Sequence, residues 1–298
     1  WSRIATGAQV GTRCSGIAVS ATDSDVIHFT GNAGYSRTTN GGTSWTRIIN
    51  FNCSALEVDP SNSNIVYVAR RGNGIYKSFN AGQNFTKLTG GLPTSGFDRV
   101  VMDISKSNPQ VLYAALIIGS NVSGIYKTID GGTTWSPLAN QPNFCAAQCW
   151  YDAYVGIDPT NSNIVYLGGV DPRYSEGGVL KSINGGASWV ETSQNGDSLH
   201  PDHHAIEFGP GNVIWEGNDG GISKSLDGGA NWINLNSTLA VTQMYHAIVH
   251  PLDASRIMGG TQDNGTPERT GNSLTWPQLQ VGDGGYSVFD PSSFSRRY

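Results

Sequence analysis

The sequence has little charge and no long apolar run. Asp, Glu, Lys and Arg make up 14% of its 298 residues, the formal net charge is −5, and Lys and Arg form no basic stripe. This pattern argues against a nucleic-acid partner. No apolar run approaches the roughly 20 residues that cross a bilayer, so we expect no membrane span. No stretch repeats apolar residues at helical spacing, which argues against a helical fold.

Glycine is abundant, with 39 residues, alongside 8 Trp and 12 Tyr. Gly, Asn, Ser and Thr separate short apolar runs, a pattern typical of short strands joined by tight turns. We therefore predict an all-β chain. Few Lys, many Asn, Ser and Thr, and 4 Cys are typical of a secreted or cell-surface protein. The chain begins at Trp1 rather than Met, so we expect a processed product or a fragment of a longer chain.

One motif recurs along the chain: a hydroxyl residue, any residue, Asp or Asn, any residue, Gly, two residues and an aromatic. The clear copies are Thr38–Trp45, Ser78–Phe85, Thr128–Trp135, Ser182–Trp189 and Ser225–Trp232. A weaker sixth copy ends at Trp276. Successive starts are 40, 50, 54 and 43 residues apart, which is the length of a four-stranded propeller blade.

A second element keeps the same phase. Asp59–Tyr67 matches Asp158–Tyr166 almost letter for letter, and Pro at its second position predicts a tight hairpin between two apolar strands. The pattern predicts a β-propeller of about seven four-stranded blades, with the recurring motif at the turn between strands 3 and 4. The six complete repeats span 14–50, 51–92, 93–140, 141–195, 196–238 and 239–281.

The two ends predict a split or truncated seventh blade within a single domain, 1–298. Trp1–Ile4 copies Trp45–Ile48, so 1–13 is expected to supply strand 4, and 282–298 reads as the start of a seventh repeat. A strand broken in mid-run leaves an unpaired edge, which favours a fragment of a longer protein.

The recurring motif resembles the Asp-box (bacterial neuraminidase, BNR) repeat. Proteins with such repeats include sialidases, xyloglucan-cleaving enzymes of glycoside hydrolase family 74 and sortilin-type (Vps10) receptor domains. The segments around Asn218-Asp219 and Gln262-Asp263-Asn264 look most similar to the xyloglucanase-like and sortilin-like propellers. The resemblance covers nearly the whole chain. It implies that the boxes are structural and that ligands bind at the opposite face.

Polar and aromatic side chains gather in the loops expected at that opposite face. The candidate catalytic carboxylates are Asp219 and Asp263, with Asp202 and Asp283 as alternates. Two such carboxyl groups could act as general acid and base on a glycosidic bond. The candidate substrate-binding residues are Trp150, Tyr151, Asp152, Arg173, His203, Tyr245 and His246. The alternative for each single Asp is that it satisfies loop backbone and ordered water.

Metal binding is a second interpretation of the same face. His200, Asp202 and His203 lie together in the sequence, although neighbouring strand residues face opposite ways, and we assign no firm metal ligand. The oxygen-rich segments 218–219 and 262–264 could instead hold Ca²⁺ or another divalent ion. We expect no other cofactor.

The four cysteines suggest two disulfides. Cys14 and Cys53 each precede the first strand of consecutive repeats, and adjacent inner strands are close, so a bridge between them is expected. Cys145 and Cys149 are four residues apart and are expected to bridge locally. A Cys-x3-Cys metal site is the alternative, but two further ligands are not apparent.

Three kinds of function remain. The favoured one is an extracellular carbohydrate-active propeller that binds polysaccharide and, if catalytic, hydrolyses it as an endo-glucanase or xyloglucanase. The alternatives are a sortilin-like propeller that binds protein or peptide, and a structural module for surface attachment or self-assembly. Sialidase activity is disfavoured because the Arg residues are dispersed and no Arg-Ile-Pro segment precedes the first box. No Gly-x-Ser-x-Gly or phosphate loop supports another common enzyme class.

Overall fold

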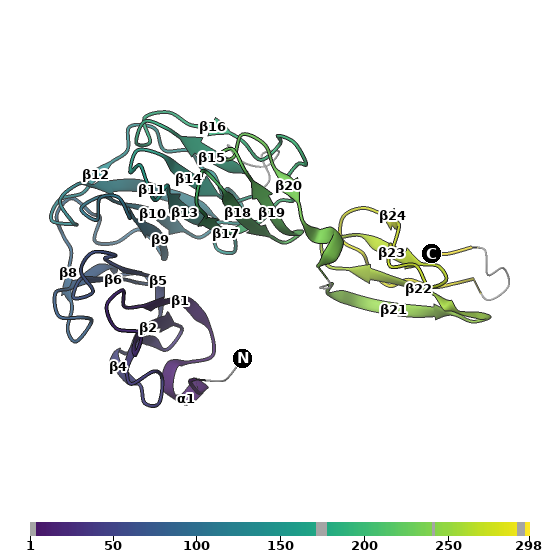
Figure 1. The fold of residues 1–298 in the computed structure, drawn as a ribbon, viewed down its shortest axis with the longest axis horizontal. Coiled ribbons are helices and arrows are strands. Elements are labelled where there is room, and N and C mark those ends of the chain that lie inside the picture. The colour runs from purple at the N-terminus through teal and green to yellow at the C-terminus, as the bar shows by residue number, and fades with distance from the viewer. Residues whose placement is uncertain (1–3, 171–177, 240–241, 291–295) are drawn as a thin grey trace. The chain divides into compact units, whose positions relative to one another are not determined.

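The computed structural model describes residues 4–170, 178–239, 242–290 and 296–298. The chain divides into two compact units, Trp1–Asn218 with Ile222–Asn234, and Asp219–Gly221 with Leu235–Tyr298. Strands dominate both units, and the two described helices are α1 (Gly7–Val10) and η1 (Asn236–Thr238) (Figure 1). Neither helix is long and apolar enough to cross a membrane.

The described residues form six antiparallel sheets of four strands each, arranged in sequence order. The first sheet contains β1 (Cys14–Val19), β2 (Val26–Gly31), β3 (Gly34–Thr39) and β4 (Thr46–Ile49). The second contains β5 (Cys53–Val58), β6 (Val66–Arg70), β7 (Gly74–Ser78) and β8 (Thr86–Lys87). The third contains β9 (Arg99–Ile104), β10 (Leu112–Ile118), β11 (Asn121–Thr128) and β12 (Ser136–Pro137). The fourth sheet contains β13 (Tyr154–Ile157), β14 (Val165–Gly168), β15 (Val179–Ser182) and β16 (Val190–Glu191). The fifth contains β17 (His203–Phe208), β18 (Ile214–Asn218), β19 (Gly221–Ser225) and β20 (Ile233–Asn234). The sixth contains β21 (Met244–His250), β22 (Asp253–Thr261), β23 (Thr266–Arg269) and β24 (Gln278–Gln280). The predicted all-β chain of four-stranded sheets is confirmed.

The cores of the first unit lie between successive sheets. The first strands contact one another in chain order, β1 with β5, β5 with β9, β9 with β13, and β13 with β17. Between the first two sheets, buried Tyr35 packs with Cys53, Leu56, Val66 and Val68. Apolar side chains on both faces of a strand bury only when a sheet covers each face, so each blade depends on its neighbours.

The five clear motif copies form one hydrogen-bonded turn between the third and fourth strands. In each copy the hydroxyl oxygen of the first residue accepts a hydrogen bond from the backbone N–H of the motif's fifth residue, Gly, at 2.8–3.0 Å. The same hydroxyl donates to the Asp or Asn oxygen at 2.8–2.9 Å. That oxygen accepts a backbone N–H four residues later at 2.8–3.1 Å. Only an acceptor oxygen is needed in these contacts, which explains why Asp and Asn both occur.

Two of the turns also connect neighbouring blades by hydrogen bonds. In the second blade, the Tyr67 hydroxyl and Lys77 Nζ both donate to the carbonyl oxygen of Gly131 in the next turn, at 2.9 and 2.7 Å. Tyr166 and Lys181 of the fourth blade bond the carbonyl of Gly228 in the same way, at 2.9 and 2.6 Å. The Tyr that ends each of the matching segments Asp59–Tyr67 and Asp158–Tyr166 therefore has a structural role between blades.

The predicted strand within 1–13 rests on Trp1–Ile4, of which residues 1–3 lie outside the described residues, so it stays a prediction. After this segment, α1 occupies Gly7–Val10, where Thr6 and Gln9 form a capping box that favours a helical turn. The carbonyl oxygen of Ile4 nonetheless accepts the Trp45 indole N–H at 2.9 Å. Trp232 makes the same contact with Thr192 of the preceding sheet.

A seventh blade is not confirmed. The described part of 282–298 contains an isolated bridge between Phe289 and Arg297. The six sheets lie inside the six predicted repeats, and their union into a single domain stays a prediction.

The predicted Cys14–Cys53 disulfide is wrong in this structure, where both cysteines are free. A register shift in β1 between Cys14 and Gly16 turns the side chains, and the Ser15 hydroxyl, rather than a thiol, donates to the Cys53 carbonyl at 2.7 Å. Cys14 is exposed, whereas Cys53 is buried and its thiol donates to the carbonyl of Phe51 at 3.2 Å. Burial raises the pKa of the Cys53 thiol to about 12.

Candidate functional site

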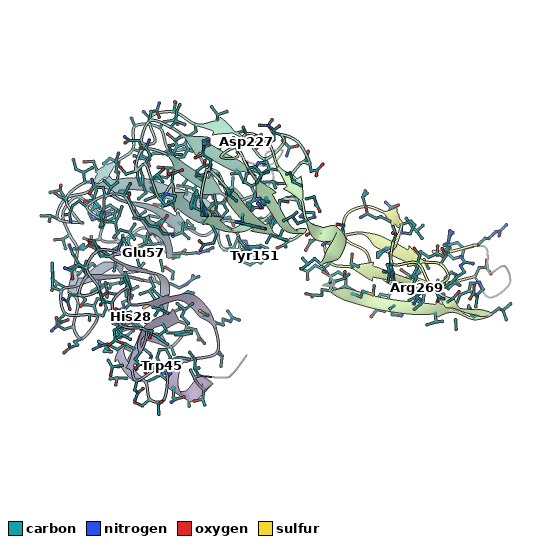
Figure 2. All side chains as sticks on the ribbon, in the orientation of Figure 1. His28, Trp45, Glu57, Tyr151, Asp227 and Arg269 are labelled. Carbon is teal, nitrogen blue, oxygen red and sulfur yellow. A yellow bond between two sulfur atoms is a disulfide. The ribbon has the colours of Figure 1, made fainter. Side chains whose placement is uncertain are left out.

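A disulfide-closed loop between the third and fourth blades carries the most developed cluster of candidate residues. Cys145 and Cys149 are bonded as expected and both are buried. The bridge constrains the chain immediately before Trp150, Tyr151 and Asp152. Figure 2 places Tyr151 and the turn residue Asp227 at opposite edges of the first unit.

Arg99, at the start of β9, binds the backbone of this loop. Its Nη1 donates to the carbonyl oxygens of Cys149 and Tyr151 at 3.0 and 3.3 Å, and its Nη2 donates to Ala153 at 3.4 Å. Burial lowers the pKa of Arg99 to about 10, and the charge of Arg71 adds to the effect, while Asp152 opposes it. The guanidinium is therefore still charged at neutral pH.

Asp152 and Asp202 form a carboxyl pair beside the loop. Asp152 is fully buried, and among the described residues no N–H group of another residue donates to either of its oxygens. Its carboxyl group contacts that of Asp202, so the contact is a hydrogen bond only when one group is protonated. Half-buried Asp202 also accepts from Gln148 Nε2 at 2.7 Å and has a positive φ of 64°. Burial first, and then Asp202, raise the pKa of Asp152 to about 8.

This raised pKa predicts that the pair weakens the fold as pH rises. An unfolded Asp titrates near ~4, so between about pH 4 and 8 the folded chain holds a proton that the unfolded chain has lost. The free energy of unfolding therefore falls with rising pH across that window. Replacing Asp152 with Asn should flatten the fall, as measured by urea unfolding from pH 5 to 8.

The matched control is Asp227→Asn. Asn occupies the same turn position in three other copies, and hydrogen bonds, first from the Asn231 side chain, lower the pKa of Asp227 to about 2. This variant should keep the wild-type slope from pH 5 to 8. An Asp152→Asn protein with an unchanged slope would contradict the shared proton.

Aromatic side chains lie next to the carboxyl pair. Trp150 is 61% exposed and Tyr151 is 38% exposed, with ring centroids 5.5 Å apart. The ring of His204 meets Tyr151 edge-on at 4.7 Å. Exposed rings beside hydrogen-bonding groups are suited to stack on the apolar faces of sugars while polar groups bind the hydroxyls.

His203, predicted to contact substrate, must be corrected to a buried structural residue. Its Nδ1 lies 2.6 Å from Glu216 Oε1, and the two side chains are 1% and 0% exposed. Asn218 Nδ2 donates to the other Glu216 oxygen at 2.8 Å. The pairing of β17 with β18 shifts register between His203 and Ala205, and in this arrangement His203 is buried while His204 takes the exposed position.

The structure does not assemble the predicted histidine metal site. His203 is engaged by Glu216, and His200 Nδ1 lies 3.0 Å from the carbonyl oxygen of Pro201. In the part of the chain that the structure describes, His200, Asp202 and His203 do not form a group able to share one ion. Arg173, the remaining candidate from this unit, lies outside the described residues.

The second unit holds the other predicted residues. Carboxylate oxygens of Asp219 and Asp263 lie within 4.8 Å of each other, so this pair could contribute ligands to a divalent ion. The backbone N–H of Asp263, which has a φ of 58°, donates to Asp283 Oδ1 at 3.0 Å. Asp283 thus supports the turn. Tyr245 is exposed, and half-buried His246 packs on Tyr286 at 5.0 Å.

Sequence reasoning missed Arg99, Gln148 and Glu216. Glu216 carried a usable signal, because a lone acid inside the apolar run of β18 must find a buried partner. Arg99 and Gln148 carried none, because their partners lie 50 to 54 residues away.

No protein-family model matches the chain. A xyloglucanase of Hypocrea jecorina (strain QM6a) is 31% identical over 108 residues, which cover 29% of this chain and 13% of the relative. A xyloglucanase of Paenibacillus sp is 26% identical over 162 residues, covering 46% of this chain and 15% of the relative. The chain thus spans a small part of the curated relatives that it matches.

Solved propellers match almost the whole chain. An ancestral GH74 enzyme has a TM-score of 0.62 at 18% identity, covering 96% of this chain and 43% of that one. The GH74 enzyme of Niastella koreensis has a TM-score of 0.63 at 19% identity, covering 94% and 54%. YCF48 from Cyanidioschyzon merolae has a TM-score of 0.53 at 15% identity, covering 96% and 91%. The fold is that of a β-propeller. At these identities the likeness concerns fold alone.

Proposed function

We propose that this chain is an extracellular carbohydrate-active propeller of glycoside-hydrolase type that binds a polysaccharide. The observation that carries the proposal is the exposed Trp150–Tyr151 pair beside the Asp152–Asp202 carboxyl groups. The local sequence similarity to two xyloglucanases supports a glucan backbone as the ligand. The Cys145–Cys149 disulfide supports an oxidising compartment.

Replacing Trp150 with Ala should weaken polysaccharide binding about tenfold, because it removes an exposed ring that can stack on a sugar, a contact worth about 1.4 kcal/mol. Isothermal titration calorimetry with a xyloglucan oligosaccharide measures this loss. Ile129→Ala is the control, since Ile129 is 70% exposed in a turn motif and should leave affinity unchanged. Equal affinity of wild type and Trp150→Ala would remove Trp150 from the site.

The candidate catalytic carboxylates of the second unit, Asp219 and Asp263, provide the test for hydrolysis. A polysaccharide panel is incubated with wild type and with an Asp219→Ala, Asp263→Ala double variant, with and without EDTA. Product release that the double variant loses would support these carboxylates as catalytic, and loss with EDTA would support a divalent ion. Binding without product would make the chain a lectin-like module. No binding to any glycan would refute the proposal and favour a protein partner or self-assembly.

A further inference from the structure

Arg99 connects three alternate carbonyl groups of the loop that displays the aromatic pair. The bonded residues are Cys149, Tyr151 and Ala153, so the contacts cover the backbone on both sides of Trp150 and of Asp152. Loop 149–153 has no strand partner of its own before β13 begins at Tyr154. The disulfide restrains one end of this segment and β13 the other, and the guanidinium fixes the residues between them.

The same contacts engage three of the five N–H donors of Arg99 with the loop backbone. Nη1 and Nη2 are both engaged by carbonyl oxygens, and the side chain is half-buried behind the loop. The other polar side chains at the loop are half-buried Asp202, Gln148 and the buried Asp152. An anionic sugar would therefore meet carboxyl groups rather than a free cation, whereas sugar hydroxyls can both donate to and accept from such groups.

We propose that Arg99 is the positioning residue of a subsite for an uncharged sugar ring, formed by Trp150, Tyr151 and Asp202. This inference rests on the proposed function. A side chain that is held in place before the ligand arrives loses less conformational entropy on binding, so fixing the loop raises affinity without any contact between Arg99 and the sugar.

The test compares Arg99→Gln with Arg71→Gln. Arg71 is an exposed arginine whose charge also acts at Arg99, so its removal changes the local charge equally. Two quantities are measured: the Kd for a neutral xyloglucan oligosaccharide by calorimetry, and amide hydrogen exchange of the peptides covering 145–153. Arg99→Gln should raise Kd about tenfold and speed exchange in that loop. Arg71→Gln should stay within about twofold of wild type in both.

A third variant, Arg99→Lys, separates charge from geometry. Lys keeps the charge but cannot span three carbonyls with a planar fork, so partial recovery of both Kd and exchange is expected. A glucuronate-bearing oligosaccharide of similar length should bind wild type more weakly than the neutral one, most clearly at low salt.

Each contrary outcome has a distinct meaning. Faster exchange in Arg99→Gln with an unchanged Kd would overturn the positioning role, and so would unchanged exchange. Preference for the glucuronate ligand would overturn the assignment to uncharged sugars. Failure of wild type to bind any glycan would refute the proposed function and the subsite together, and the exchange data would still report whether Arg99 orders the loop.

Discussion

Gly82→Ala is expected to destabilise the first unit by about 3 kcal/mol, because a Cβ at this position has no room. Such an atom would overlap the hydroxyl oxygen of Tyr35, in a backbone conformation with φ of 78°. Tyr35 cannot move aside easily, since it is fully buried between the first two blades and its hydroxyl is hydrogen-bonded to Nδ1 of His28 at 2.7 Å.

Gly72→Ala is the matched control for this effect. Gly72 also has a positive φ, of 62°, but nothing lies within 4 Å of its added Cβ. Gly72→Ala should lower the free energy of unfolding by about 1 kcal/mol, which is the strain of the backbone conformation alone. Urea unfolding of both variants gives the comparison. Equal decreases in the free energy of unfolding would mean that Tyr35 moves away from the added Cβ. The packing between the two blades would then be looser than the burial of Tyr35 indicates.

His203→Leu is expected to cost about 3–5 kcal/mol, because it leaves the Glu216 carboxylate buried without its partner. The imidazole and the carboxylate meet at 2.6 Å with almost no exposure, and the carboxylate also lies near the buried hydroxyl of Tyr154. Burial, and then Glu216, hold the pKa of Tyr154 well above its usual value, so this hydroxyl stays neutral.

The double variant His203→Leu, Glu216→Leu should recover most of the lost stability, since two apolar side chains then replace the whole pair. Thermal and urea unfolding provide the measurement, and glycan titration is run on the same proteins. A His203→Leu protein of normal stability that fails to bind glycan would restore His203 as a substrate contact. A double variant as unstable as the single one would show that volume, rather than charge, decides this position.

Sequence reasoning succeeded where the determining contacts are local. The motif Thr128–Trp135 predicts its turn because hydroxyl, carboxylate and backbone N–H groups lie within four residues of each other. The Cys145–Cys149 bridge is present for the same reason. The Cys14–Cys53 prediction failed because it depended on the register between two strands, which one irregularity in β1 altered.

By itself, the sequence determined the repeat, its four-stranded sheets and the turn chemistry, because these follow from periodic short-range patterns. Only the tertiary structure decided which polar residues meet. Asp152 pairs with Asp202, Gln148 reaches Asp202, and Arg99 binds the loop at Cys149, all across about 50 residues of chain. Blade packing sets these contacts, and an irregular register in β17 between His203 and Ala205 accompanies a buried His203 next to an exposed His204.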